Sequence, residues 1–399
     1  MSRSTLAGLA AIALACTTLV GCTDETAPGA PQAAASGAAG PQEGEETVAP
    51  LSVRANLRGD GVAVDEELRV RATGGTLTQV RVTSAAGRLP GELSKDGGSW
   101  TATGRLEPNQ AYDVRTVAVR SDGKRVVDTS SFRTDDLTLD EQTYASVAPL
   151  QGETVGVGMP VIVNFDVAVT DKASMERHMH VESAPAQPGA WHWLSDHEAH
   201  WRPKTYWQAG TDVSVDLDIN SVDAGNGIYG QEARSVDFSV GDAHVYKVDA
   251  QAHQMKVFSN GALLRTIPIT TGKAGFITRS GTKVIMEKFR ERRMNSETVG
   301  IGQDDPEYYD IDDVEYAMRV TYSGEFIHAA PWSVDSQGNA NVSHGCTGMS
   351  TADAAYLYDM TLRGDVVEYT GTNRPMTLEN GYGDWNVDFA TWKQGSALS

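Results

Sequence analysis

Short segments of alternating apolar and polar residues dominate the first third of this chain. Between about Pro50 and Asp136 they include LRVRAT, TQVRVTS, YDVRTVAVR and TSSFRT, separated by Gly, Asp, Asn and Pro turns. Alternation with period two places every second side chain on one face of a strand. Short strands at regular spacing are typical of a β-sandwich. The sequence therefore predicts a β-sandwich over residues 49–147.

A second series of alternating segments follows a connector that has no repeat of its own. It begins after Ala148 with VIVNFDVAV, continues with VSVDLDI and ends with RSVDFSVG. The same argument predicts a second, small β-sandwich over residues 148–241, with a domain boundary near residue 147.

The region 242–371 is predicted to be a β-rich domain with one short helix. An Asn-Gly pair between two strand-like runs indicates a tight hairpin. The helix is expected over residues 351–361, with Ser350 as its N-cap and Gly364 as its stop signal. The C-terminal extension, residues 372–399, contains enough aromatic residues to predict that it packs on this domain. The fold class is therefore mainly β.

The N-terminus carries a signal for export. One arginine precedes an apolar run from Leu6 to Val20 that is too short to span a bilayer. The run ends in LVGC, which resembles the lipobox of bacterial lipoproteins and implies a signal peptide over residues 1–21 and a lipidated Cys22. Residues 22–48 lack aromatic side chains, so they predict a flexible linker. We expect an exported protein, lipid-anchored to the outer face of the bacterial cytoplasmic membrane and facing the cell wall.

The charge of the chain argues against a nucleic-acid partner. The sequence has 33 Lys and Arg residues against 53 Asp and Glu residues, a formal net charge of −20. It therefore lacks the basic footprint that nucleic acids or anionic lipids require. Neutral or amine-bearing partners fit this charge, and so does an acidic surface that only keeps an exported protein soluble.

Cys346 would be the only free thiol of the mature chain. Of the three cysteines, Cys16 lies in the predicted signal peptide and Cys22 is the predicted lipidation site. A nucleophilic thiol needs a base that holds it near the thiolate. Spacing alone allows either His344 or His328 to be that base, because residues two apart share one face of a strand.

Four motifs after residue 320 form a specific pattern, which consists of HAAPWS at 328–333, SHGC at 343–346, RGDVVE at 363–368 and GDWN at 383–386. With these motifs, the chain from Val245 to about Trp392 resembles the L,D-transpeptidases. These are cysteine enzymes that cross-link bacterial peptidoglycan, here in the actinobacterial form with tandem immunoglobulin-like modules. The resemblance implies that Cys346 is the nucleophile and His328 its general base, oriented by the backbone carbonyl of Ala329.

The same resemblance implies two further groups of site residues. The residues expected to shape the site and help to form the oxyanion hole are Ser343, His344 and Gly345. The expected substrate-binding residues are Met294, Ser296, Tyr309, Trp332, Thr347 and Gly348. The first three fall where relatives carry a lid, and a one-residue shift leaves Tyr308 as the alternative to Tyr309. Many relatives have Asn or Arg in place of Gly348, so a substrate contact made by that side chain is absent or comes from elsewhere.

The implied reaction is the formation of 3→3 peptidoglycan cross-links. Cys346 would form a thioester with a donor tetrapeptide stem, release D-Ala and pass the acyl group to the amine of a second stem. The resemblance implies no metal or organic cofactor, peptidoglycan stem peptides as partners, and carbapenems as inhibitors. Water as acceptor would make the site an L,D-carboxypeptidase, and a protein amine would make it an anchoring enzyme. A cysteine peptidase of another family and a non-catalytic cell-wall-binding lipoprotein are the competing hypotheses.

A cluster of histidines and tryptophans in the second sandwich allows further interpretations. The histidines are His178, His180, His192, His197 and His200. They suggest a metal site, but no recognisable ligand spacing supports it and we predict no metal. The tryptophans are Trp191, Trp193, Trp201 and Trp207. They could form a glycan platform, although such residues more often belong to a core.

Overall fold

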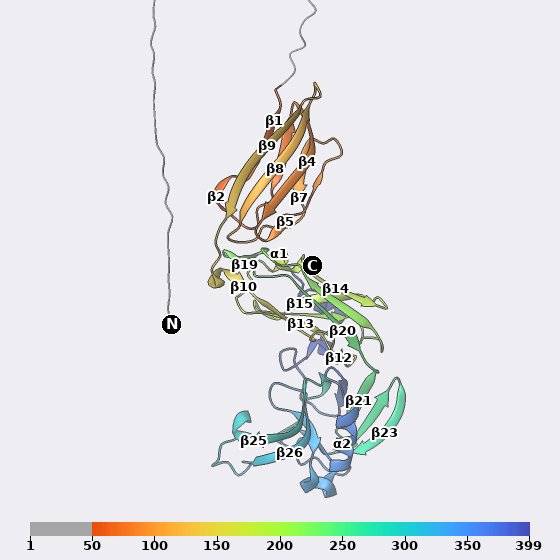
Figure 1. Ribbon diagram of the computed structural model, residues 1–399. Helices are drawn as coiled ribbons and strands as arrows, with labels where there is room; N and C mark the ends of the chain where they lie inside the picture. Colours follow the sequence, from red (N-terminus) through yellow and green to blue (C-terminus); the bar gives the residue numbers. More distant parts are fainter. Residues whose placement is uncertain (1–49) are drawn as a thin grey trace, which may run out of the picture. The chain divides into compact units, whose positions relative to one another are not determined.

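The computed structural model describes residues 50–399, so the predicted signal peptide, the lipidated Cys22 and most of the predicted linker lie outside the described residues. Figure 1 shows a mainly β architecture, coloured from orange at the start of the described part to blue at its end. Within that part, every helix is too short or too polar to cross a bilayer.

The first sandwich has a four-stranded and a five-stranded sheet. The first sheet has the order β1 (Ser52–Ala55), β3 (Arg69–Thr73), β7 (Ser99–Ala102) and β6 (Gly91–Leu93). The second has the order β2 (Gly59–Val62), β9 (Arg125–Thr134), β8 (Ala111–Arg120), β4 (Gly75–Ser84) and β5 (Gly87–Leu89). On β8, buried and exposed residues alternate over its first six positions, as the sequence pattern predicts. The inward side chains form one core that includes Val70, Val82, Trp100 and Val114.

The second sandwich is built from two four-stranded sheets and a small three-stranded sheet. The four-stranded sheets have the orders β11 (Ala145–Ala148), β13 (Val161–Phe165), β16 (Glu198–Pro203), β15 (Gly189–Trp193), and β12 (Thr154–Val155), β20 (Arg234–Val240), β17 (Asp212–Leu217), β14 (Met179–Ala184). The small sheet has the order β10 (Gln142–Thr143), β19 (Ile228–Gly230), β18 (Asp223–Gly225). The helix α1 (Lys172–Glu176) follows β13, and the 3₁₀ helix η1 (Leu139–Glu141) precedes β10.

The predicted boundary near residue 147 is several residues too late. Strands β10 and β11 begin before it and pair with β19 and β13 of the second sandwich. The alternating signal of β11 covers only the four small residues Ala-Ser-Val-Ala. Such a short run cannot be told from a connector by its pattern.

The third domain contains two sheets, and the helix α2 (Thr351–Met360) packs on one of them. One sheet has the order β23 (Ala262–Pro268), β22 (Gln254–Ser259), β21 (His244–Asp249), β29 (Val366–Thr370) and β24 (Gly281–Val284). The other has the order β25 (Glu287–Asn295), β26 (Asp310–Arg319), β27 (Phe326–Ala329) and β28 (Thr347–Met349). The remaining elements are α3 (Phe389–Lys393), η2 (Ser296–Val299), η3 (Pro331–Ser336) and η4 (Asp384–Asn386).

Two local predictions for this domain are confirmed. The hairpin between β22 and β23 turns at Asn260 and Gly261, both of which have positive φ, as such a tight turn requires. The helix α2 begins after Ser350, whose hydroxyl accepts the N–H of Asp353 at 3.1 Å, and it ends one residue earlier than predicted.

The second sandwich and the third domain share a hydrophobic core. Arg363 forms a two-pronged ion pair with Glu153, at 2.8 and 2.5 Å. The backbone N–H groups of Gly156 and Gly158 donate to the carbonyls of Arg363 and Gly364, each at 2.8 Å. The third-domain and C-terminal side chains that join the sandwich core are Val284, Met286, Val366 and Tyr382. These contacts make residues 142–399 one packed body.

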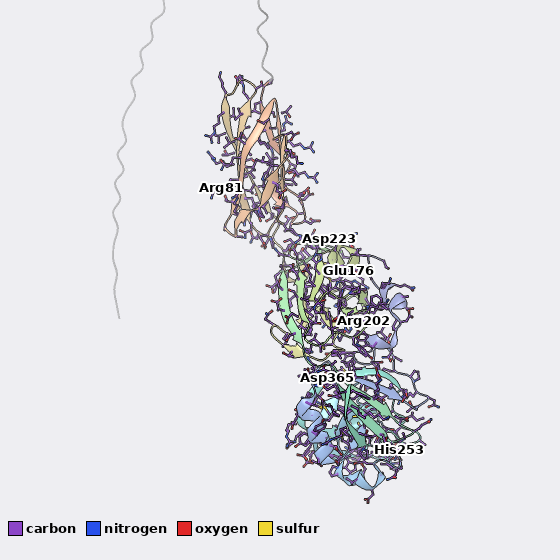
Figure 2. The ribbon with its side chains drawn as sticks, turned by 90° about the vertical axis from the view of Figure 1, so that its right-hand side faces the viewer. Arg81, Glu176, Arg202, Asp223, His253 and Asp365 are labelled. Carbon is purple, nitrogen blue, oxygen red and sulfur yellow. The ribbon has the colours of Figure 1, made fainter. Side chains whose placement is uncertain are left out.

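The C-terminal extension packs on the second sandwich as well as on the third domain. Arg202 of β16 lies 4.7 Å from the ring centroid of Trp385 and 4.8 Å from that of Trp392, and Figure 2 shows it beside the blue ribbon of the extension. The rings of His192 and Trp392 stack at 4.4 Å. The sequence predicts that the extension packs on the third domain, and the contacts with the second sandwich come in addition. The aromatic content of the extension does not indicate which surface the extension covers.

We expect the Trp392→Ala variant to be less stable by about 3–5 kcal/mol, since this side chain is fully buried and its loss leaves a large cavity. Urea denaturation of residues 49–399 measures the change. The control is Trp332→Ala, because Trp332 is 57% exposed and should cost little. Equal stability of the two variants would contradict this packing of the extension.

A buried ion pair also ties the extension to the sandwich. His200 contacts Asp384 through Nδ1 and Glu198 through Nε2, both at 2.8 Å. Burial alone would lower the pKa of His200, but the charge of Asp384 and the two hydrogen bonds outweigh it and raise the pKa to about 9. The folded protein therefore holds this proton more tightly than the unfolded chain does.

The resulting contribution to stability should depend on pH. It is complete below the unfolded pKa of His200 and is lost as the pH rises toward 9, at a slope of at most about 1.4 kcal/mol per pH unit. Urea denaturation at pH 6.5 and pH 9 should show a larger fall for the wild type than for Asp384→Asn. Comparing the two proteins removes the effects of all other titrating groups, and an identical fall in both would refute this role.

Candidate active site

Cys346 lies in the wall of a cavity of about 390 Å³ in the third domain. The structure brings most of the predicted site residues to this cavity, namely Met294, Tyr309, His328, Trp332, Ser343, His344, Cys346 and Gly348. They come from the β25–β26 hairpin, from β27 and η3, and from the segment that leads into β28. The motifs separated in the sequence therefore meet at one place.

Strand pairing explains why the histidine and the cysteine motifs meet. Strands β27 and β28 are parallel neighbours, and His328 lies opposite Gly348. Cys346 immediately precedes β28, so it enters the cavity at the edge next to His328.

The imidazole of His328 is held in one orientation. Its Nδ1 lies 2.7 Å from the carbonyl oxygen of Ala329, so Nδ1 donates and Nε2 is left to accept a proton. The ring lies 5.9 Å from the ring of Trp332. Burial lowers the pKa of His328, and the hydrogen bond to Ala329 only partly opposes this. At neutral pH the residue is a neutral base.

The thiol of Cys346 is protonated in the free protein. Burial raises its pKa to about 11, although the backbone N–H of Phe326 favours the thiolate. Its Sγ lies 3.7 Å from the carbonyl oxygen of Gly324. The neutral thiol and the neutral imidazole line the same cavity, and attack by the sulfur requires the transfer of its proton to a base, which is the pairing that acyl transfer needs.

The turn that presents Cys346 is fixed by hydrogen bonds. The hydroxyl of Ser343 donates to the carbonyl of Cys346 at 2.6 Å and accepts the N–H of Gly345 at 3.1 Å. Gly345 has φ +125°, a conformation open to glycine. Thr278 donates to the Gly345 carbonyl at 2.8 Å. Because its N–H is occupied, Gly345 shapes the turn here and does not offer an oxyanion donor.

The imidazole of His344 is engaged by Glu307. Its Nε2 lies 2.8 Å from Oε2 of Glu307, which also accepts from Lys273 at 2.6 Å. The ring packs against Phe276 and Tyr309, with centroid distances of 4.6 and 5.0 Å. Of the two bases that spacing allows, the geometry favours His328. No sequence signal pointed to Glu307, Lys273 or Phe276, since nothing in the motifs pairs them with His344.

Tyr309 lines the cavity, whereas Tyr308 lines neither of the cavities at Cys346. Burial and the neighbouring Cys346 raise the pKa of Tyr309 to about 12, so its hydroxyl remains a hydrogen-bond donor. Ser296, predicted to bind substrate, is fully buried behind the lid. Its hydroxyl accepts the N–H of Tyr309 and donates to Ile301, both at 3.1 Å, so it positions Tyr309.

Two more of the predicted substrate-binding residues need correction or explanation. Thr347 is buried and its hydroxyl lies 2.8 Å from that of Tyr369, because neighbouring residues in a strand point to opposite faces. Gly348 lines the cavity, but a Cβ there would come within 2.8 Å of the Ala330 side chain and 3.2 Å of Thr270. The space for the Asn or Arg of relatives is therefore filled.

A second cavity also reaches Cys346. It measures about 180 Å³ and shares Met294, Tyr309 and Cys346 with the first cavity. Its wall also contains three arginines, Arg292, Arg293 and Arg319. The thiol is thus accessible from two compartments, one of them basic, and the sequence motifs indicate neither this cavity nor its arginines.

The histidines and tryptophans of the second sandwich have structural contacts. His178 and His197 contact backbone carbonyls of Ser174 and Phe165, both at 2.9 Å. No group of three candidate ligand side chains gathers around a metal position in residues 50–399. The four tryptophans of the postulated glycan platform are at most 8% exposed and belong to the shared core.

Comparison with known proteins assigns two parts of the chain to families. Residues 243–368 match the family described as the L,D-transpeptidase catalytic domain, and residues 59–223 match the bacterial Ig domain family. L,D-transpeptidase 2 of Mycobacterium tuberculosis is 34% identical over 84% of this chain and 82% of that protein. L,D-transpeptidase 5 of the same species is 34% identical over 83% of this chain and 73% of that protein. The structure of the LD transpeptidase LdtMt1 in complex with imipenem matches with 38% identity and a TM-score of 0.50, covering 57% of this chain and 98% of that one.

Proposed function

Because the chain belongs to the L,D-transpeptidase family, we propose that it forms 3→3 cross-links in peptidoglycan through a thioester on Cys346. The donor is a tetrapeptide stem, and the bond that breaks joins diaminopimelate to the terminal D-Ala. The observation that carries this proposal is the pairing of a neutral thiol with an imidazole whose Nε2 is left to accept a proton.

In the acylation step, Nε2 of His328 takes the thiol proton as Sγ attacks the donor carbonyl. The carbon–nitrogen bond then breaks, and the imidazolium returns the proton to the departing amine of D-Ala. Tyr309, whose hydroxyl stays protonated, would donate to the carbonyl oxygen as negative charge develops.

In the second step, the amine of another stem attacks the thioester. His328 removes a proton from this amine, the carbon–sulfur bond breaks, and Cys346 leaves as a thiolate that recovers the proton. The presence of two cavities at the thiol supports two substrates. The arginines of the smaller cavity suit a carboxylate-bearing stem.

We further propose that the protein acts outside the cytoplasmic membrane as a lipoprotein anchored through Cys22. Its substrates would then be the stems of the adjacent cell wall. Since a solved relative is in complex with imipenem, carbapenems should acylate Cys346 in this chain.

Incubation of residues 49–399 with a purified disaccharide-tetrapeptide, followed by mass spectrometry, tests the proposal. A dimer that has lost one D-Ala is the expected product. Tripeptide alone would show that water is the acceptor and the site is a carboxypeptidase. Unchanged substrate together with tight binding would support the non-catalytic cell-wall-binding lipoprotein.

A further inference from the structure

Three charged side chains meet behind the turn that carries Cys346. Oε2 of Glu325 accepts from Nζ of Lys283 at 2.5 Å, and Oε1 accepts from Nη1 of Arg279 at 2.8 Å. The side chains of Lys283 and Glu325 are 0% and 6% exposed, and that of Arg279 is 15% exposed. A buried ion pair seldom adds stability over well-packed apolar residues. The position of the cluster beside the nucleophile therefore points to a role other than stability.

Glu325 contacts the nucleophile turn through its own chain neighbours. The carbonyl of Gly324 lies 3.7 Å from Sγ of Cys346, and the N–H of Phe326 favours the thiolate. The Glu325 side chain packs beside Gly345, where an added Cβ would lie 3.8 Å from its Cγ. The ion pairs thus fix the backbone on one side of the sulfur.

Lys283 reaches the other neighbour of Cys346 through Tyr369. Its Nζ lies 3.7 Å from the ring centroid of Tyr369, a cation–π contact. The hydroxyl of Tyr369 lies 2.8 Å from that of Thr347, the residue that follows the nucleophile. The cluster therefore lies beside Gly345 and is linked to Thr347 through Tyr369.

The charges of the cluster act on the sulfur with opposite signs. Glu325 disfavours the thiolate and Lys283 favours it. With Arg279 the cluster contains two cations and one anion, a net positive charge next to a thiol that must become an anion. The other titratable groups around Cys346 are His328, His344, Tyr309, Tyr322 and Tyr369, and the arginines Arg292, Arg293 and Arg319 of the smaller cavity. Only Glu325 and Lys283 act as charges on the pKa of the thiol.

We propose that Arg279, Glu325 and Lys283 form a positioning cluster for Cys346, in which Lys283 supplies the charge that favours the thiolate and Glu325 holds both cations against the turn. The inference rests on the proposed role of Cys346 as nucleophile. Burial lowers the pKa of Lys283 to about 8 in spite of Glu325, so the ammonium is present at neutral pH and is lost in the alkaline range.

The rate of Cys346 alkylation by iodoacetamide, measured from pH 6 to 11 by intact mass, tests the cluster without a peptidoglycan substrate. Cys346 is the only cysteine of residues 49–399, so the adduct reports one site. Lys283→Met should slow alkylation at pH 7 about tenfold, equivalent to about one unit in the thiol pKa, and the difference from the wild type should close above about pH 8, where wild-type Lys283 itself loses its proton. Glu325→Gln should shift the profile to lower pH, by a smaller amount because Lys283 then loses its proton more easily.

The opposite directions separate this role from a structural one. Both substitutions break the same ion pair, so a structural role alone would slow alkylation in both variants at every pH. The control is Lys256→Met, an exposed lysine on β22, which should leave the profile unchanged. If Lys283→Met does not fold, Arg279→Gln should give a weaker shift in the same direction, and an unshifted profile in that variant would overturn the proposal.

The outcomes also separate this inference from the proposed function. If the alkylation profiles shift as expected but the wild type yields neither dimer nor tripeptide, the cluster stands and the function fails. If the wild type forms cross-links but the profiles do not shift, the function stands and the cluster has no electrostatic role.

Discussion

The Cys346→Ala variant should form neither cross-linked dimer nor tripeptide, with a loss of at least about 10⁴-fold in the rate of either product. The reason is that every step of the proposed reaction passes through a bond to Sγ. Residues 50–399 offer no second thiol. Mass spectrometry of the products formed from a disaccharide-tetrapeptide measures the loss, and the same variant should show no mass increase with imipenem.

Stability must be compared in the same experiment. Cys346 is half-buried, so its loss should change the urea midpoint little, and an unfolded variant would be recognised at once. Cys346→Ser keeps the shape and the hydrogen-bonding capacity of the side chain. It should be nearly as inactive as Cys346→Ala, since a hydroxyl is a much weaker nucleophile than a thiol at neutral pH. A carbapenem adduct on Cys346→Ala would remove this residue from the mechanism.

The His328→Gln variant should lower the rate of acylation by about 10²- to 10⁴-fold, the usual contribution of a general base. Glutamine can still donate to the Ala329 carbonyl, but it offers no nitrogen that takes up a proton. Single-turnover acylation by imipenem, followed by intact mass, isolates this step from the transfer to an acceptor.

His344→Gln is the matched comparison. It removes the imidazole ring that packs against Phe276 and Tyr309, so we expect mainly weaker substrate binding and a modest change in the acylation rate. Sequence spacing alone left His344 and His328 as equal candidates for the base. A larger loss in His344→Gln than in His328→Gln would reverse the assignment made from the geometry.

Much of the fold could be predicted because its information is local. The alternation along β8, β17 and β20 gives the strands and their inward faces, and the Asn-Gly turn and the Ser350 cap give the hairpin and α2. The partners of the C-terminal extension could not be predicted. Its contacts with Arg202 and His192 span almost 200 positions of sequence, and no periodicity encodes them.

The site residues also divide into those that local motifs predict and those that only the fold brings together. The motifs predicted Cys346 and the other cavity residues, but Ser296 and Thr347, expected there from the resemblance, are buried and do not line the cavity. For Thr347 the strand period could have given the correct answer, because it is adjacent to Cys346. Glu307 and the buried cluster around Glu325 became visible only once distant segments were placed together.

The shared core of the second sandwich and the third domain defines what can be exchanged between proteins of this kind. A chimera that takes residues 242–399 alone would present Val284, Met286, Val366 and Tyr382 to a foreign surface, and Arg363 would lack its carboxylate partner. A graft that begins before β10 carries the whole core with it. In recombination or in protein engineering, the second sandwich, the catalytic domain and the C-terminal extension should therefore be transferred together.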